Sequence, residues 1–324
     1  MKKIFLVFSL ICLIALISTG CFGDSPPKKD FNYEIPNGTK IIDNETIPKK
    51  IKKSITSITI PDSVTEIGEY AFYDCKYAKT INIPKSVKTI GEYAFYKCKS
   101  LEQISIPNGI TKIEKYTFSH CDALNDMNIP NSVTKIGDFA FENCNSLTDV
   151  IIPESLTEIE EGAFAHCYAL TRINLPKKLT KIKAYTFCSC SSLTNIVIPE
   201  GINEIGKYAF DCAELKTLNL PKSLKIIDNY AFCYCDSLTS IEIPNGVTKI
   251  GDFAFSNLNK VTKVTIPESV TEIGEYAFNG NLKVETIKIP DSVNKIGKDA
   301  FFVVKHIEYH GTAEGAPWGA KSMN

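Results

Sequence analysis

Apolar residues recur along most of this chain with a spacing of about 23 residues. An Ile-Pro or Leu-Pro step marks each unit, and of the ten intervals between these prolines nine are 23 residues and one is 22. The prolines are Pro61, Pro84, Pro107, Pro130, Pro153, Pro176, Pro199, Pro221, Pro244, Pro267 and Pro290. Such regular self-similarity predicts a solenoid in which each unit contacts mainly its neighbours, and not a globule around one core.

The unit at residues 101–121 predicts two short extended segments and a turn. Residues 104–106 read Ile-Ser-Ile, and this alternation is typical of a strand with one buried face. Pro107 lacks an amide hydrogen, so the strand pairing ends there. Residues 110–113 predict a second extended segment, and the turn that follows ends in Phe118.

One phenylalanine keeps the same position in all eleven units, which predicts a buried aromatic spine along the solenoid axis. These residues are Phe72, Phe95, Phe118, Phe141, Phe164, Phe187, Phe210, Phe232, Phe255, Phe278 and Phe301. A row of tyrosines two residues earlier is expected to shield the edge of the core, or alternatively to contact partners. This row is Tyr70, Tyr93, Tyr116, Tyr185, Tyr208, Tyr230 and Tyr276.

Seven cysteines stand three residues after a spine phenylalanine and form a ladder of equivalent positions. They are Cys75, Cys98, Cys121, Cys144, Cys167, Cys190 and Cys235. We interpret them as buried thiols that pack coil against coil. Disulfides between adjacent coils remain an alternative, because stacked strands lie about 4.8 Å apart, near the lower limit for the two Cα atoms of a disulfide.

Neither a metal site nor an enzyme is expected from the remaining cysteines and histidines. Cys188 and Cys233 lack the Cys-x-x-Cys spacing of structural zinc sites, and their position in the unit otherwise carries residues that should face solvent. His120 and His166 lie two coils apart. Neither a catalytic Ser/His/Asp arrangement nor a Gly-rich phosphate loop is found, so no cofactor is predicted.

The N-terminus predicts export. Two lysines precede an apolar run at residues 4–17, and small residues at 18–20 precede Cys21. The sequence Ile-Ser-Thr-Gly-Cys resembles the lipobox of prokaryotic lipoproteins, which implies a signal peptide at 1–20 and lipidation of Cys21. Residues 21–34 predict a tether, and the protein is expected at the extracytoplasmic face of a membrane, on the cell surface. An ordinary signal peptide and a cytosolic chain remain alternatives.

Over residues 58–301 the units resemble the BspA-like leucine-rich repeats of prokaryotic and protist surface proteins. They follow the pattern C-x-x-L-x-x-I-x-I-P-x-x-V-x-x-I-G-x-x-A-F. The resemblance implies an α/β-type leucine-rich-repeat solenoid shaped as a curved horseshoe. Short parallel strands would line its concave side, with second extended segments plus turns or short 3-10 or helical pieces on the convex side. Residues 35–57 are expected to form an N-terminal cap with a degenerate repeat, and residues 302–324 a C-terminal cap with Trp318 as its lid.

Residues that flank the buried isoleucine of the first strand vary from unit to unit and are expected to face solvent. A cluster near the middle is the candidate binding surface: Asp126, Asn128, Asp149, Ile151, Arg172, Asn174, Asn195 and Val197. The resemblance implies adhesion to a protein or an extracellular polymer. A structural spacer without a specific ligand is the alternative. Nucleic acid is not an expected partner, because the 36 basic and 37 acidic residues are interspersed.

Overall fold

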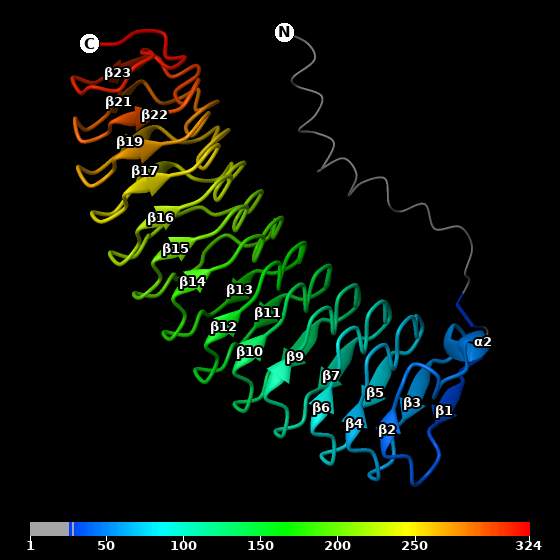
Figure 1. Ribbon diagram of the computed structural model, residues 1–324. Helices are drawn as coiled ribbons and strands as arrows, with labels where there is room; N and C mark the ends of the chain where they lie inside the picture. Colours follow the sequence, from blue (N-terminus) through cyan, green and yellow to red (C-terminus); the bar gives the residue numbers. More distant parts are fainter. Residues whose placement is uncertain (1–25, 28) are drawn as a thin grey trace.

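The computed structural model describes residues 26–27 and 29–324, which form a curved solenoid of stacked coils (Figure 1). A typical coil contributes one strand to each of two rows, and a proline-containing outer turn joins the two strands. A longer turn, which we call the inner-edge turn, carries the spine phenylalanine and leads to the next coil.

The first row contains β1 (Asn32–Glu34), β3 (Ser57–Thr59), β5 (Thr80–Asn82), β7 (Gln103–Ser105), β9 (Asp126–Asn128), β11 (Asp149–Val150), β13 (Arg172–Ile173), β17 (Ser240–Glu242), β19 (Lys263–Thr265), β21 (Thr286–Lys288) and β23 (His306–Glu308). The second row contains β2 (Ile41–Ile42), β4 (Glu66–Ile67), β6 (Thr89–Ile90), β8 (Lys112–Ile113), β10 (Lys135–Ile136), β12 (Glu158–Ile159), β14 (Lys181–Ile182), β15 (Glu204–Ile205), β16 (Ile226–Ile227), β18 (Lys249–Ile250), β20 (Glu272–Ile273) and β22 (Lys295–Ile296).

All strand pairing is parallel, and equivalent residues of successive coils lie side by side. Ile104 pairs with Met127, and both side chains are buried, whereas Gln103 and Asp126 pair on the solvent side. This register follows from the period, since a shift of one residue would expose every buried isoleucine.

The spine phenylalanines are completely buried and stack from Phe72 to Phe301, with ring centroids 5.1–6.0 Å apart. The predicted aromatic spine is therefore confirmed. Each spine residue up to Phe278 also donates its backbone N–H to the carbonyl of the residue before the next spine phenylalanine, as Phe72 does to Ala94 at 2.8 Å. The spine thus runs beside a continuous backbone ladder.

The tyrosines of the predicted row are half-buried, and their backbones are left-handed, with φ of 53–60°. Neighbouring rings stack, for example Tyr70 on Tyr93 with centroids 4.7 Å apart. A left-handed backbone is costly for a bulky residue, and stacking of this kind is worth about 0.5–1.5 kcal/mol, so the ladder helps to offset that cost. The tyrosines do shield the edge of the core.

Two expectations about the shape are wrong. The strands do not line the concave side: in Figure 1 the inner-edge turns lie inside the curve, the outer turns fan out on its outside, and the strand rows form the flanks. The convex side carries turns and no helical pieces. In the described part of the chain the one helix is the single-turn α2 (Lys49–Lys52), beside the first coil, so the fold is a β-solenoid and not of α/β type.

The second row is divided into three sheets, which end between β6 and β8 and between β12 and β14. Most coils carry glycine directly after the second strand, and coils approach closely there: a Cβ on Gly91 would lie 2.7 Å from the backbone nitrogen of Glu69. Both breaks coincide with coils that carry Glu114 or Lys183 in this position. Glu160 and Asp228 also replace glycine: β12 still pairs with β10 although its sheet ends there, and β16 pairs with strands on both sides.

Both ends of the solenoid are capped. β1 pairs with β3, so the first coil begins at Asn32, within the segment 21–34 that was assigned to the tether. At the other end Trp318 is 5% exposed and packs against Tyr309, and its carbonyl accepts a hydrogen bond from Phe301. Trp318 is therefore the predicted lid. None of the helices in the described residues is long and apolar enough to cross a membrane.

Candidate binding surface on the first strand row

The eight predicted surface residues lie together on the flank formed by the first row, and all are exposed. β9, β11, β13 and residues 194–198 of the next coil position them. Ile151 and Val197 are the most exposed large apolar residues of the described chain, at 77% and 81%. We call these eight residues the first-row patch.

An ion pair links two coils at the centre of this patch. Arg172 and Asp149 are register partners in β13 and β11, and Nε of the arginine lies 2.6 Å from Oδ1 of the aspartate. Both side chains are largely exposed, so the pair contributes at most about 1 kcal/mol to stability. Its charges therefore remain accessible to a partner.

Asn174 makes a different kind of contact between coils. Its side-chain oxygen accepts from the N–H of Ile152, and its side-chain nitrogen donates to the carbonyl of the same residue, both at 2.8 Å. The Asn174 side chain thus bonds the backbone N–H and carbonyl of Ile152, which would otherwise be available to the backbone of a neighbouring strand. Regular strand pairing ends beyond β13.

The patch coincides with an interruption of the first row. β11 and β13 form a sheet of their own, which is joined to β9 by an isolated bridge between Asn128 and Ile151. Residues 194–198 and 216–220 contain no strand, although the second row runs without a break from β14 to β22. The coils therefore stay paired on one flank and lose their regular pairing on the other, near the 22-residue unit.

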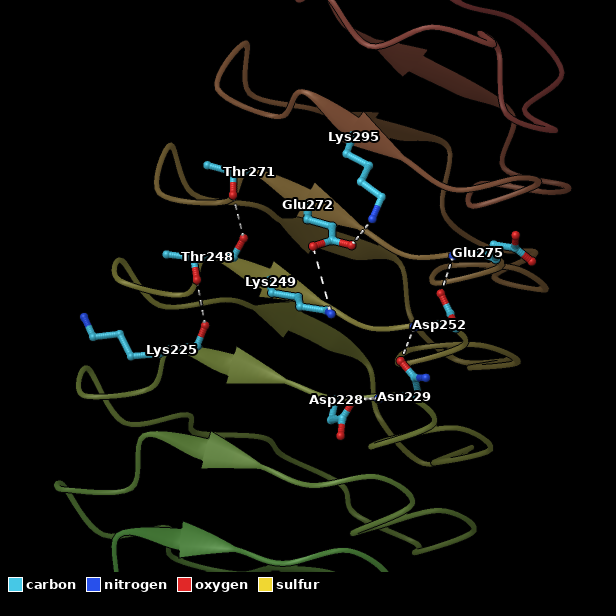
Figure 2. A network of polar contacts seen from close by, with 10 residues as sticks. All are labelled: Lys225, Asp228, Asn229, Thr248, Lys249, Asp252, Thr271, Glu272, Glu275 and Lys295. Atoms are coloured by element: carbon cyan, nitrogen blue, oxygen red, sulfur yellow. Dashed lines mark hydrogen bonds and ion pairs between the residues drawn. The ribbon is translucent and has the colours of Figure 1, made fainter.

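The opposite flank is occupied by contacts among its own side chains. Figure 2 shows Glu272 between two lysines, with carboxylate oxygens 4.0 Å from Nζ of Lys249 and 2.6 Å from Nζ of Lys295. In the same view Asn229 and Asp252 each accept a backbone N–H of the next coil at 2.8 Å. The charges of Glu272, Lys249 and Lys295 thus link successive coils on this flank, as Asp149 and Arg172 do in the first-row patch.

The ladder cysteines are completely buried, as predicted, and they contribute more than packing. Cys98, Cys121, Cys144, Cys167, Cys190 and Cys235 each donate Sγ–H to the spine carbonyl of the preceding coil, at 3.1–3.3 Å. Burial raises the pKa of the Cys75 and Cys167 thiols to about 12. None of the ten cysteines in the described residues forms a disulfide, and the raised pKa values of the ladder cysteines make these thiols poor nucleophiles.

Cys188 and Cys233 differ from the prediction that they face solvent. They are only 7% and 2% exposed, in the position directly after the spine phenylalanine. In other coils Tyr73 and Tyr96 at this position pack edge-on against the tyrosine row, so the inner-edge turn covers the slot. Among the residues described by the structure, no group of three or more His, Cys, Asp or Glu side chains could hold a metal ion.

The sequence did not single out Asp211, which lies between Cys188 and Cys233 in the same slot of successive coils. Its carboxyl is largely buried, and burial raises its pKa to about 7. The Cys188 thiol lies 4.0 Å from Oδ2. No periodic signal marked this aspartate, because the slot accepts many residue types.

The predicted lipidation site Cys21 and the signal peptide at 1–20 lie outside the described residues.

Short parallel strands in every coil, an invariant buried spine and a variable exposed flank define a leucine-rich-repeat solenoid. The chain belongs to the BspA-type leucine-rich-repeat family. The family model, described as "BspA type Leucine rich repeat region", matches in six copies over residues 45–134, 111–238 and 225–312.

Solved structures show the same architecture. A leucine-rich repeat protein from Bacteroides ovatus is 26% identical, with a TM-score of 0.56, over 90% of this chain and 82% of that one. A leucine rich cell surface protein from Faecalibacterium prausnitzii is 23% identical, with a TM-score of 0.56, over 91% and 89%. A leucine-rich repeat protein from Eubacterium ventriosum is 21% identical, with a TM-score of 0.53, over 88% of this chain and 91% of that one. A search of curated proteins found no match.

Proposed function

We propose that this protein binds a partner protein outside the cell through the first-row patch. The observation that carries the proposal is the exposure of Ile151 and Val197, at 77% and 81%, where the first-row sheet is interrupted. A single exposed aliphatic side chain is common on protein surfaces. Here two exposed aliphatic side chains, Ile151 and Val197, lie on either side of Asn174 in successive coils.

The chemistry of the patch suits a polypeptide. The two aliphatic side chains offer apolar contact, Asp149 and Arg172 offer both signs of charge, and the asparagines offer amide donors and acceptors. The eight residues include no aromatic ring, so a sugar has no surface on which to stack. A protein is therefore the favoured partner, and an extracellular polymer is the other outcome of the test.

Anchoring is part of the same proposal. Residues 1–20 serve as a signal peptide, Cys21 is acylated, and a short tether carries the solenoid at the extracytoplasmic face, on the cell surface. Support comes from the sequence before Cys21 and from a structural neighbour described as a cell surface protein. Mass spectrometry of the mature protein tests this: a diacylated or triacylated N-terminal Cys21 is expected, and an unmodified residue at that position contradicts it.

An array of purified extracellular-matrix proteins and glycans tests the binding function. The wild-type chain should bind a specific component saturably. The exchange D149R/R172D keeps an ion pair between coils but reverses its direction, so binding should weaken while stability stays unchanged. Binding that is indifferent to the exchange contradicts the role of this pair.

The structural spacer is the second candidate, and one feature favours it. The backbone ladder of the inner edge continues through every coil from Phe72 to Phe278, which gives a stiff body. About eleven stacked strands would span roughly 50 Å. If the folded protein binds no component of the array, the spacer is the better account.

A further inference from the structure

A hollow at the N-terminal end of the solenoid lies apart from the first-row patch and shares no residue with it. It lies between the cap helix α2 and the first inner-edge turn, and its volume is about 330 Å³. In Figure 1, α2 is the blue helix at the start of the coils, beside these turns. The lining residues are Asn44, Lys49, Lys52, Lys53, Tyr70, Tyr73 and Asp74.

Lys52 is the unusual member of this set, because it is only 6% exposed. It stands three residues before the buried Ile55, as Cys75 stands three residues before the buried Ala78, so a lysine replaces the ladder cysteine in the cap. Its Nζ donates to the carbonyl of Ala71 at 3.4 Å, which is long for a hydrogen bond. An ammonium group has three donors, and a buried one strongly favours an anionic partner.

Charge gathers around this lysine. The cap at residues 35–57 contains five lysines but only two acidic residues, in a chain whose net charge is −1. Three of these lysines line the hollow, and Asp74 is the only carboxylate among the lining residues. Burial, together with the nearby positive charge of Lys49, lowers the pKa of Lys52. An anion in the hollow would stabilise the charged form of Lys52 against both the burial and the repulsion from Lys49.

We propose that this hollow binds a phosphate group, either free or as part of a lipid headgroup. The ammonium groups of the lysines that line the hollow are charge-assisted donors of the kind that phosphate oxygens prefer. The amide of Asn44 and the phenols of Tyr70 and Tyr73 supply neutral donors for further oxygens. This site is independent of the proposed partner surface.

Titration calorimetry of the full chain with inorganic phosphate in a chloride buffer tests the site. Wild-type protein should bind one phosphate, and K49Q/K53Q should weaken the affinity at least about tenfold, since charge-assisted hydrogen bonds are lost. Lys50 is the matched control, because it is exposed on the same helix but does not line the hollow, and K50Q should stay within about twofold. K52M should also abolish binding, and if it fails to fold, the double variant still decides.

Lysine acetylation read by mass spectrometry separates the two sources of phosphate. Protection of Lys49 and Lys53 relative to Lys50 by inorganic phosphate assigns a free phosphate. The same protection by phosphatidylglycerol vesicles alone, and not by phosphatidylcholine vesicles, assigns a lipid headgroup. The proposal is overturned if neither probe protects these lysines, or if Lys50 is protected equally, which indicates diffuse attraction to a basic surface.

Discussion

Cys144 donates its thiol hydrogen to the carbonyl oxygen of Phe118 in the preceding coil, with Sγ and O 3.3 Å apart. In a later coil Asn281 takes the same position and donates Nδ2–H to the carbonyl of Phe255 at 3.0 Å. Two chemically different side chains thus donate to equivalent buried carbonyls in different coils. The ladder position therefore provides a hydrogen-bond donor as well as a packing group.

Replacing this donor should cost stability. C144A leaves the Phe118 carbonyl without its thiol partner and opens a small cavity, so the free energy of unfolding should fall by about 1–3 kcal/mol. C144S keeps a hydroxyl donor and should lose less. Urea unfolding at pH 7 measures both variants, and a C144A chain as stable as wild type would show that the bond contributes nothing.

Buried thiols should make the fold sensitive to alkali. Burial raises the pKa of Cys75 and Cys167 to about 12, whereas an unfolded thiol has a pKa of about 8.5. The unfolded chain therefore releases these protons first as the pH rises. Their stabilising effect is complete below pH 8.5 and is lost progressively up to about pH 12.

Urea midpoints at pH 7.5 and 9.5 measure this effect, and the midpoint should fall at the higher pH. Each such thiol contributes a slope of up to about 1.4 kcal/mol per pH unit. The control is a thiol count on the denatured, unreduced chain, in which all ten repeat cysteines should react. Equal midpoints at the two pH values, or a count near zero, would refute the buried-thiol account.

The close approach of coils at glycine gives a third prediction. A Cβ on Gly137 would lie 2.7 Å from the backbone nitrogen of Lys115, so G137A must push two coils apart and should cost about 1–3 kcal/mol. Gly109 is the matched control, because the nearest atoms to its Cβ belong to the flexible Lys88 side chain at 3.3 and 3.4 Å. Thermal unfolding should separate the two variants, and equal melting temperatures would argue against tight stacking at Gly137.

The buried carboxyl of Asp211 should lower the stability of the fold as the pH rises. Burial raises its pKa to about 7, so the folded state resists its ionisation. Stability is unaffected below pH 3.8 and declines as the pH rises to about 7, because the unfolded chain ionises first. D211N should therefore stabilise the protein at pH 8, by roughly 3–4 kcal/mol more than at pH 4. A gain of the same size at both pH values would contradict this account.

The repeat period predicted most of the fold, because it is a direct record of which residues each coil buries. The spine phenylalanines and the outward position of Asp149 and Arg172 follow from it, whereas the lid at Trp318 was predicted from the need to cap the last coil. The left-handed backbone of the tyrosines does not, since stacking between coils offsets a strain that the residue type alone opposes.

Other features were beyond the sequence because they depend on how coils pack. The burial of Cys188 and Cys233 depends on the tightness of the inner-edge turn. The interruption of the first row near Val197 occurs in coils whose second-row strands stay paired, so it concerns one flank alone. The period predicts the features that every coil shares, whereas these features occur in particular coils that depart from the repeat.

The most direct test of the proposed function is binding of the array component by V197E and S105E. Both changes place a carboxylate at the same outward, exposed position of the first row, in coils four units apart. With circular dichroism confirming that both variants fold, V197E should lose at least about tenfold in affinity, and S105E should bind as wild type does. Wild-type affinity in V197E would contradict the assignment of the first-row patch as the partner surface.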